Sequence, residues 1–221
     1  MTYSPGIYAT TTQFKARMGI TNTTDDSTIG SALATASRAI DDHCSDSFYR
    51  DATATIRYFT ATQPDRVEID PVVSVTALVT DIAGLRAYAT TWTATDYDLF
   101  PANIAEIGRP YRSLETRTGS TKVFPLYPMG VKLTAIYGWP AVPEQITEAC
   151  LLWASHLYKR KDTPWGVAGA FEFGEMRVLK DIDPDVERLL LPFVRGHRGA
   201  LTLQIQHTAL QGAMKQMGRA R

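Results

Sequence analysis

The stretch Trp139–Arg195 decides the fold of this chain: WPAVPEQITEACLLWASHLYKRKDTPWGVAGAFEFGEMRVLKDIDPDVERLLLPFVR. Pro143 lies where a helix begins, because the fixed φ of proline suits a first turn whose N–H has no partner. Apolar residues then recur at helical spacing, with polar residues on the other side. These apolar residues are Ile146, Cys150, Trp153 and Leu157. The pattern predicts an amphipathic helix over 143–161.

A glycine-rich arm, residues 161–181, follows this helix, and Asp183-Pro184 then begins a second helix. An apolar surface on a glycine-rich loop is typical of a contact surface. The arm is therefore predicted to pack on a neighbouring subunit or a tail-side partner, and folding back on its own core is the alternative. The residues expected to make this contact are Trp165, Val167, Phe171, Phe173 and Met176.

Two further helices are predicted near the start of the chain. Thr11 or Thr12 can cap a short helix that Gly19 ends, and one of Asp25, Asp26 and Ser27 can cap a longer one. The longer helix carries one apolar face rich in alanine, so another helix is expected to pack closely against it. The two helices of the 139–195 stretch are the expected partners.

The region between these helix pairs is predicted to form short strands. It is rich in Thr, Val, Tyr and Ile, and proline and glycine interrupt it repeatedly. The best alternation of apolar and polar residues lies near its end, from Val131 to Gly138. Strands are expected near 53–60, 66–69, 73–81, 92–99, 122–124 and 131–138.

The order and spacing of these segments resemble the head-to-tail connector proteins of long-tailed phages, also called adaptor or head completion proteins. Both ends of the chain carry the resemblance. The matching stretches are Phe14–Ile20, Ala39–Asp42 with Phe48-Tyr49, Trp139-Pro140, Leu151–Tyr158, Asp183–Leu190 and Pro192-Phe193. The resemblance implies an α+β fold, with a four-helix core built from both chain ends and a strand-rich insertion between helices 2 and 3. The expected parts are the N-terminal core helices (1–51), the insertion (52–138), the C-terminal core helices with the arm (139–195), and a basic tail (196–221).

The charge of the chain is unevenly distributed. The formal net charge is zero, with 23 basic and 23 acidic residues, yet no acidic residue follows Glu187. The segment after Glu187 is therefore basic, unlike the rest of the chain. It could dock on a partner or remain disordered. Docking on the portal protein is the expectation. The residues assigned to it are Leu201, Leu203, Ile205, Leu210, Met214 and Met217, with Arg219 and Arg221 as electrostatic guides.

No motif predicts catalysis, a cofactor or a metal site. Asp41, Asp42, His43, Cys44 and Asp46 are the densest set of metal-ligand types, but at i, i+4 spacing only Asp42 pairs with Asp46. A partly buried helix end is the favoured interpretation. Cys44 and Cys150 lie on helices expected to pack together, so the two could meet. Neighbouring buried thiols are then expected rather than a disulfide, because no secretory leader is evident and the cytosol is reducing. No apolar run approaches the ~20 residues that span a bilayer.

The resemblance implies a structural virion protein and no enzyme. It would assemble in the bacterial cytoplasm, bind the portal vertex as a dodecameric ring, and extend the DNA channel toward a tail-side completion or stopper protein. Packaged DNA would pass without sequence-specific contact. The alternative from the residues themselves is a nonspecific DNA-binding packaging or maturation factor, since the basic tail could contact phosphates.

Overall fold

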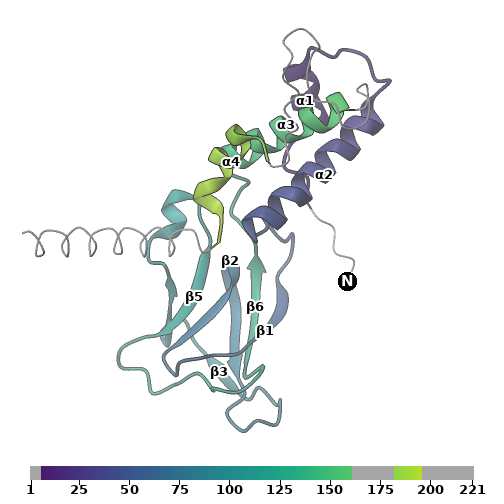
Figure 1. Ribbon diagram of the computed structural model, residues 1–221. Coiled ribbons are helices and arrows are strands. Elements are labelled where there is room, and N and C mark those ends of the chain that lie inside the picture. The colour runs from purple at the N-terminus through teal and green to yellow at the C-terminus, as the bar shows by residue number, and fades with distance from the viewer. Residues whose placement is uncertain (1–5, 161–181, 196–221) are drawn as a thin grey trace, which may run out of the picture. The chain divides into compact units, whose positions relative to one another are not determined.

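The computed structural model describes residues 6–160 and 182–195, which form two compact units. The sheet unit contains Gly6 and Ser47–Pro143, and the helical unit contains Ile7–Asp46 and the described residues from Glu144 onward. Figure 1 shows the elements of both units. The boundaries expected from the sequence, at 52 and 138, remain a prediction.

The helical unit is built around two long helices, α2 (Asp26–Cys44) and α3 (Glu144–Lys159), which pack on each other. The short helix α1 (Thr11–Met18) packs against both, and α4 (Pro184–Leu190), followed by the 3-10 turn η3 (Leu191–Phe193), packs on α3. The α2–α3 contact is close because small residues face it: Ala32, Ala36, Ala149 and Ala154 are buried.

The ends of these helices follow their local sequence. Thr10, one residue before the expected cap, accepts a hydrogen bond from Gln13 N and forms a capping box with the Gln13 side chain. Gly19 ends α1 in the left-handed conformation. Asp25 is the N-cap residue of α2, but its side chain forms no hydrogen bond to the helix. The side chain of Asp183, the N-cap of α4, accepts a hydrogen bond from Asp185 N. None of the described helices is long and apolar enough to cross a membrane.

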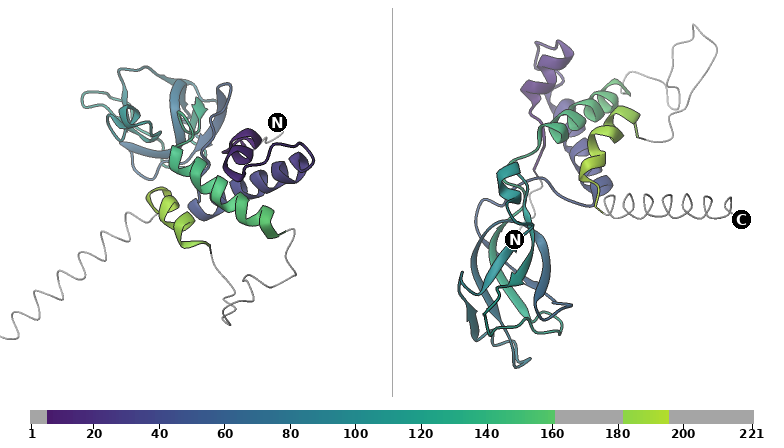
Figure 2. Two further views of the ribbon diagram at one scale, coloured as in Figure 1. Left: turned by 90° about the horizontal axis from the view of Figure 1, so that it is seen from above. Right: turned by 90° about the vertical axis from the view of Figure 1, so that its left-hand side faces the viewer.

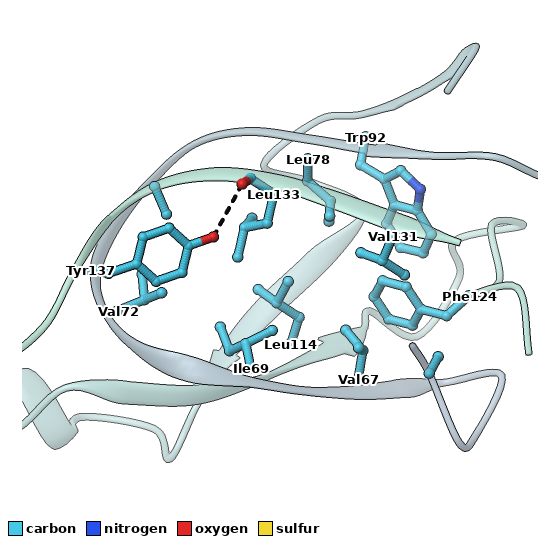
Figure 3. Packing of buried hydrophobic residues seen from close by; sticks show 12 residues of the cluster. Val67, Ile69, Val72, Leu78, Trp92, Leu114, Phe124, Val131, Leu133 and Tyr137 are labelled. Atoms are coloured by element: carbon cyan, nitrogen blue, oxygen red, sulfur yellow. Dashed lines mark hydrogen bonds between the residues drawn. The ribbon is translucent and has the colours of Figure 1, made fainter. Parts of the chain in front are cut away.

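The sheet unit holds one six-stranded antiparallel sheet in the order β1-β6-β2-β5-β4, with β3 also paired to β2. The strands are β1 (Thr55–Phe59), β2 (Arg66–Thr80), β3 (Thr90–Trp92), β4 (Tyr97–Phe100), β5 (Tyr111–Thr116) and β6 (Val131–Tyr137). The first half of β2 pairs with β5 and the second half with β6. Irregular register on both sides of Val72 marks where β2 bends, so that the sheet curls around its own core (Figures 2 and 3).

The core of the sheet unit lies inside this curl. Twelve buried residues form it, with Tyr137 and Val72 at one end and a stacked pair, Trp92 and Phe124, at the other (Figure 3). The two rings of that pair are parallel within 8°, with centroids 4.4 Å apart. The polar tips are satisfied: Tyr137 donates to Leu133 O at 3.1 Å, and Trp92 Nε1 donates to Thr80 Oγ1 at 2.9 Å.

Trp92→Phe is expected to destabilise the sheet unit by about 1–3 kcal/mol, because it leaves the buried Thr80 hydroxyl without its donor. Urea unfolding followed by circular dichroism measures this loss. The matched control is the double variant Trp92→Phe/Thr80→Val, which removes both partners and should recover part of the stability. A double variant no more stable than Trp92→Phe alone would contradict the explanation.

The expected four-helix core with a strand-rich insertion is wrong. The helices do not form such a core, since α2 and α3 are the long pair and α1 and α4 have only 8 and 7 residues. The strands are no appendage either, because the six-stranded sheet has its own core of twelve buried residues. The strand-rich part is thus a full structural unit.

Several strand predictions also need correction. Residues 66–69 and 73–80 belong to one bent strand, β2, which ends one residue before the predicted 81, and 92–99 contains a turn between β3 and β4. Residues 122–124 are not a strand, although Phe124 N donates to Pro64 O at 2.8 Å. The strand β5 was not expected. The prediction over 131–138 agrees with β6, whose residues alternate strictly between buried and half-buried.

Candidate contact surfaces

The two surfaces expected from the sequence lie outside the described residues. The tail residues Leu201, Leu203, Ile205, Leu210, Met214, Met217, Arg219 and Arg221 fall in 196–221, and the arm residues Trp165, Val167, Phe171, Phe173 and Met176 fall in 161–181. Their roles therefore remain predictions. The structure does describe the points from which both segments start.

The tail starts from the C-terminal end of α2. Arg195 N donates to Cys44 O at 3.0 Å, and Arg195 Nη2 lies 3.6 Å from Asp46 Oδ1. The Asp46 side chain is only 2% exposed, so the arginine supplies a positive charge close to a carboxylate that has little access to water. Phe193, two residues earlier, is buried as well. The chain is thus fixed up to the residue before the tail.

The described residues that flank the arm approach each other in the helical unit. His156, near the end of α3, places Nε2 3.8 Å from Asp183 Oδ2, and Asp183 is the residue that caps α4. The described residues on either side of the arm, at the end of α3 and the start of α4, therefore lie close together.

The acidic end of α2 is held by neighbouring side chains of the same unit. The Tyr8 hydroxyl donates to Asp41 Oδ1, Arg38 forms an ion pair with Asp41, and the Arg38 guanidinium lies 5.8 Å from the centroid of the Tyr8 ring. Burial raises the pKa of Asp41 above its usual value, although the hydrogen bond from Tyr8 and the charge of Arg38 oppose the rise. In the described ranges, no group of three or more His, Cys, Asp or Glu side chains could hold a metal ion.

The two cysteines are free and fully buried. Cys150 Sγ lies 3.4 Å from Ser37 Oγ, and Ser37 is seven residues before Cys44, or about 10 Å along the α2 axis. The two thiols therefore do not face each other, and the expectation that they would be neighbours is wrong. Burial, followed by the nearby Asp46 and Asp41 carboxylates, raises the pKa of Cys44 to about 12, and burial also raises the pKa of Cys150.

Neither thiol of the folded protein is expected to react with a maleimide or an aromatic disulfide at pH 8. The reactive form is the thiolate, and both burial and the raised pKa keep these groups protonated. Two thiols should become reactive when the chain is unfolded in guanidinium. Labelling of one cysteine within minutes under native conditions would show that its surroundings open more readily than the packing implies.

Two exposed apolar turns lie in the sheet unit. The first, the Leu85 turn (residues 81–88), follows β2 and exposes Ile82 by 60% and Leu85 by 79%. It is held firmly: Arg86 N donates to a carboxylate oxygen of the buried Asp81, and Gly84 N donates to Tyr127 Oη at 2.9 Å. Gly84, Arg86 and Tyr88 all have positive φ. A loop with this many constraints presents its apolar side chains in fixed positions.

The second, the Ile107 turn (residues 103–108), contains the 3-10 helix η1 (Ile104–Ile107) between β4 and β5. Left-handed residues, Asn103 and Gly108, stand at its two ends, and Gly108 N donates to Ala105 O at 3.0 Å. Ile107 is 67% exposed. Sequence reasoning missed both turns, because an isolated Ile or Leu between strands looks the same whether it is buried or exposed.

Comparison with solved structures finds a chain with a similar fold. A chain from a structure titled "Neck of empty GTA particle computed with C6 symmetry", GTA being a gene transfer agent, matches with a TM-score of 0.53 and 23% identity over 87% of this chain and 92% of that one. This chain has the fold of a particle neck protein. The resemblance to head-to-tail connectors is thus confirmed at the level of the fold.

A second chain, from "Virion of native gene transfer agent (GTA) particle", has 22% identity over 87% of this chain and 92% of that one, with a TM-score of 0.45. No family model and no curated protein matches the sequence.

Proposed function

We propose that this chain is a structural virion protein, a head-to-tail adaptor that binds the portal vertex as a ring and extends the DNA channel toward the tail. The observation that supports it is the match to the neck chain, which spans nearly the whole of both chains and includes both the helical and the sheet unit.

The proposed ring has twelve subunits that match the portal. Twelve is a multiple of six, so such a ring is compatible with the six-fold symmetry applied to the similar neck. A cyclic ring uses heterologous contacts, in which two different surfaces of each subunit meet. Each subunit then also needs one surface for the portal and one for the tail-side completion or stopper protein.

The tail is the proposed portal-binding segment. It follows Arg195, which is fixed at the end of α2, and it is the most basic part of the chain. Its apolar residues, Leu201 to Met217, would bury against the portal, while Arg219 and Arg221 would guide the approach electrostatically. The arm, with Trp165 and Phe171, is the proposed contact to a neighbouring subunit or to the tail side.

Negative-stain imaging of the protein mixed with portal rings of the same genome, together with mass determination, tests this function. We expect added ring density at the narrow end of the portal, with a mass that fits twelve copies. The protein alone and the portal alone are the controls. A complete lack of association at any salt concentration would overturn the adaptor function.

A nonspecific DNA-binding factor is the competing function, and the basic tail favours it. Phosphate contacts release counterions, so this function predicts an affinity for duplex DNA that falls steeply with salt, in the absence of affinity for portal rings. Fluorescence anisotropy with a labelled duplex between 50 and 300 mM salt distinguishes the two. The adaptor function predicts only weak DNA binding and tight portal binding.

A further inference from the structure

The Leu85 turn and the Ile107 turn lie at opposite ends of the sheet. The Leu85 turn follows Thr80, whose partner is Val131, the first residue of β6. The Ile107 turn precedes Tyr111, whose partner Val72 also pairs with Tyr137, the last residue of β6. The length of β6 separates these ends by about 20 Å. Figure 1 shows the first turn at the bottom of the sheet and the second, a short teal helix, near its top.

The two turns carry opposite exposed charges beside their apolar residues. In the Leu85 turn Arg86 is exposed, while the only carboxylate, Asp81, is buried and occupied by Arg86 N. In the Ile107 turn Glu106 is the only charged residue and is exposed, while Arg109, which follows and donates its N–H to Ile104 O at 3.2 Å, is half-buried. Among the described residues, neither the Arg86 nor the Glu106 side chain forms an ion pair.

We propose that the Leu85 turn of one copy packs against the Ile107 turn of the next copy, with Arg86 opposite Glu106. This inference rests on the proposed ring and names one of its lateral contacts. Both surfaces belong to the sheet unit, so every copy presents one of each at opposite ends. That is the arrangement a heterologous contact requires, because each subunit then has a neighbour on either side.

Charge selects this pairing over the symmetric ones. Two Leu85 turns in contact would bring two Arg86 side chains together, and two Ile107 turns would bring two Glu106 side chains together. Only the mixed contact places opposite charges beside the apolar residues. Two turns bury little area and exposed ion pairs contribute little, so a single contact is weak and the portal is expected to template the ring.

Cysteine cross-linking tests the contact directly, because the native Cys44 and Cys150 are buried. The variants are Leu85→Cys and Ile107→Cys, and the reagent is a short bis-maleimide, applied to each variant alone and to an equal mixture, on portal rings and at high protein concentration without portal. We expect a covalent dimer with one copy of each variant in the mixture, and no dimer from either variant alone. The wild-type protein is the background control.

The outcomes separate this contact from the adaptor function. Imaging that shows a ring on the portal without cross-linking in the mixture would overturn the contact and leave the adaptor function standing. Cross-linked mixed dimers without portal binding would support the contact and overturn the adaptor function. Homodimers of a single variant as the main product would show a symmetric contact and overturn the proposal, as would the absence of both cross-linking and portal binding.

Charge reversal provides a second readout. Adding Arg86→Glu to the Leu85→Cys variant should lower the yield of mixed dimer about fivefold, the effect of about 1 kcal/mol at an exposed pair. Adding Glu106→Arg to the Ile107→Cys variant should then restore the yield. A yield of mixed dimer that changes with neither substitution would contradict the pairing of Arg86 with Glu106.

Discussion

Removal of residues 199–221 will abolish binding to portal rings and leave both units folded. The deletion removes the six apolar residues and two arginines proposed to bury against the portal. Burial of an apolar side chain contributes about 1.5–3 kcal/mol, so even a fraction of this set corresponds to a loss of affinity of at least 100-fold. The fold should survive, because the deletion begins beyond Arg195, the last residue held to α2.

Sedimentation of portal rings with bound protein measures the affinity, and thermal unfolding checks the fold. Arg219→Ala/Arg221→Ala is the matched control, since it keeps the apolar residues and should mainly slow association and reduce its dependence on salt. Arg188→Ala is a second control: its side chain is 83% exposed, so only one charge and its exposed ion pair with Asp185 at 4.0 Å are lost. Unchanged portal binding by the truncated protein would remove the tail from the proposed interface.

Gly138→Ala will prevent the sheet unit from folding stably. A Cβ at Gly138 would lie 1.9 Å from Tyr49 O and 2.9 Å from Arg50 Cα, and both are backbone atoms that cannot rotate away. The residue also has a φ of +105°, which a side chain disfavours. Its N–H donates to Pro71 O at 2.8 Å, so a shift of Gly138 would break that bond at the bend of β2.

A loss of several kcal/mol is expected from Gly138→Ala, comparable to the largest effects of single substitutions and sufficient to unfold a marginal domain. Near-ultraviolet circular dichroism and urea unfolding measure it. Gly30→Ala is the matched control, since Gly30 lies within α2 with nothing within 4 Å of its added Cβ, and there alanine should stabilise the helix by about 0.5–1 kcal/mol. A Gly138→Ala protein as stable as wild type would mean that the backbone at Gly138 and the backbone at Tyr49 and Arg50 can move apart at little cost in free energy.

Periodic segments could be predicted from the sequence, and segments governed by long-range pairing could not. The alternation in β6 and the helical spacing in α3 are local, and both elements lie where they were expected, within two residues. In β5 only Ser113 and Leu114 are buried, so its sequence, YRSLET, lacks an apolar face. It is a strand because β2 and β4 pair with it on both sides.

At Pro71 a valid rule about proline in strands led to a wrong prediction of two strands in place of β2. Proline removes a strand N–H, so the sequence favoured two strands separated by a break. The structure instead places Pro71 at the bend of a single strand, where its carbonyl accepts from Gly138. The curl of the sheet, which makes this bend necessary, depends on residues more than 60 positions away.

The candidate contact surfaces divide in the same way. Composition drew attention to the arm and the tail, which lie outside the described residues, so their roles remain predictions. The exposed apolar residues of the two turns are Ile82 and Leu85 in the first and Ile107 in the second. Only their exposure distinguishes these residues from core residues of the same type. A single sequence contains no information on exposure at an isolated loop residue.

The pairing of α2 with α3 has a consequence for synthesis on the ribosome. About 100 residues separate the end of α2 from the start of α3, and translation of that length takes about 5–20 s. During this interval the apolar face of α2, including Ile29, Leu33 and Ile40, has only the short helix α1 as a partner and lacks α3. The last strand of the sheet emerges before α3, so the sheet unit can fold first. Chaperone binding to nascent chains should therefore peak before residue 144 emerges and fall once α3 covers α2.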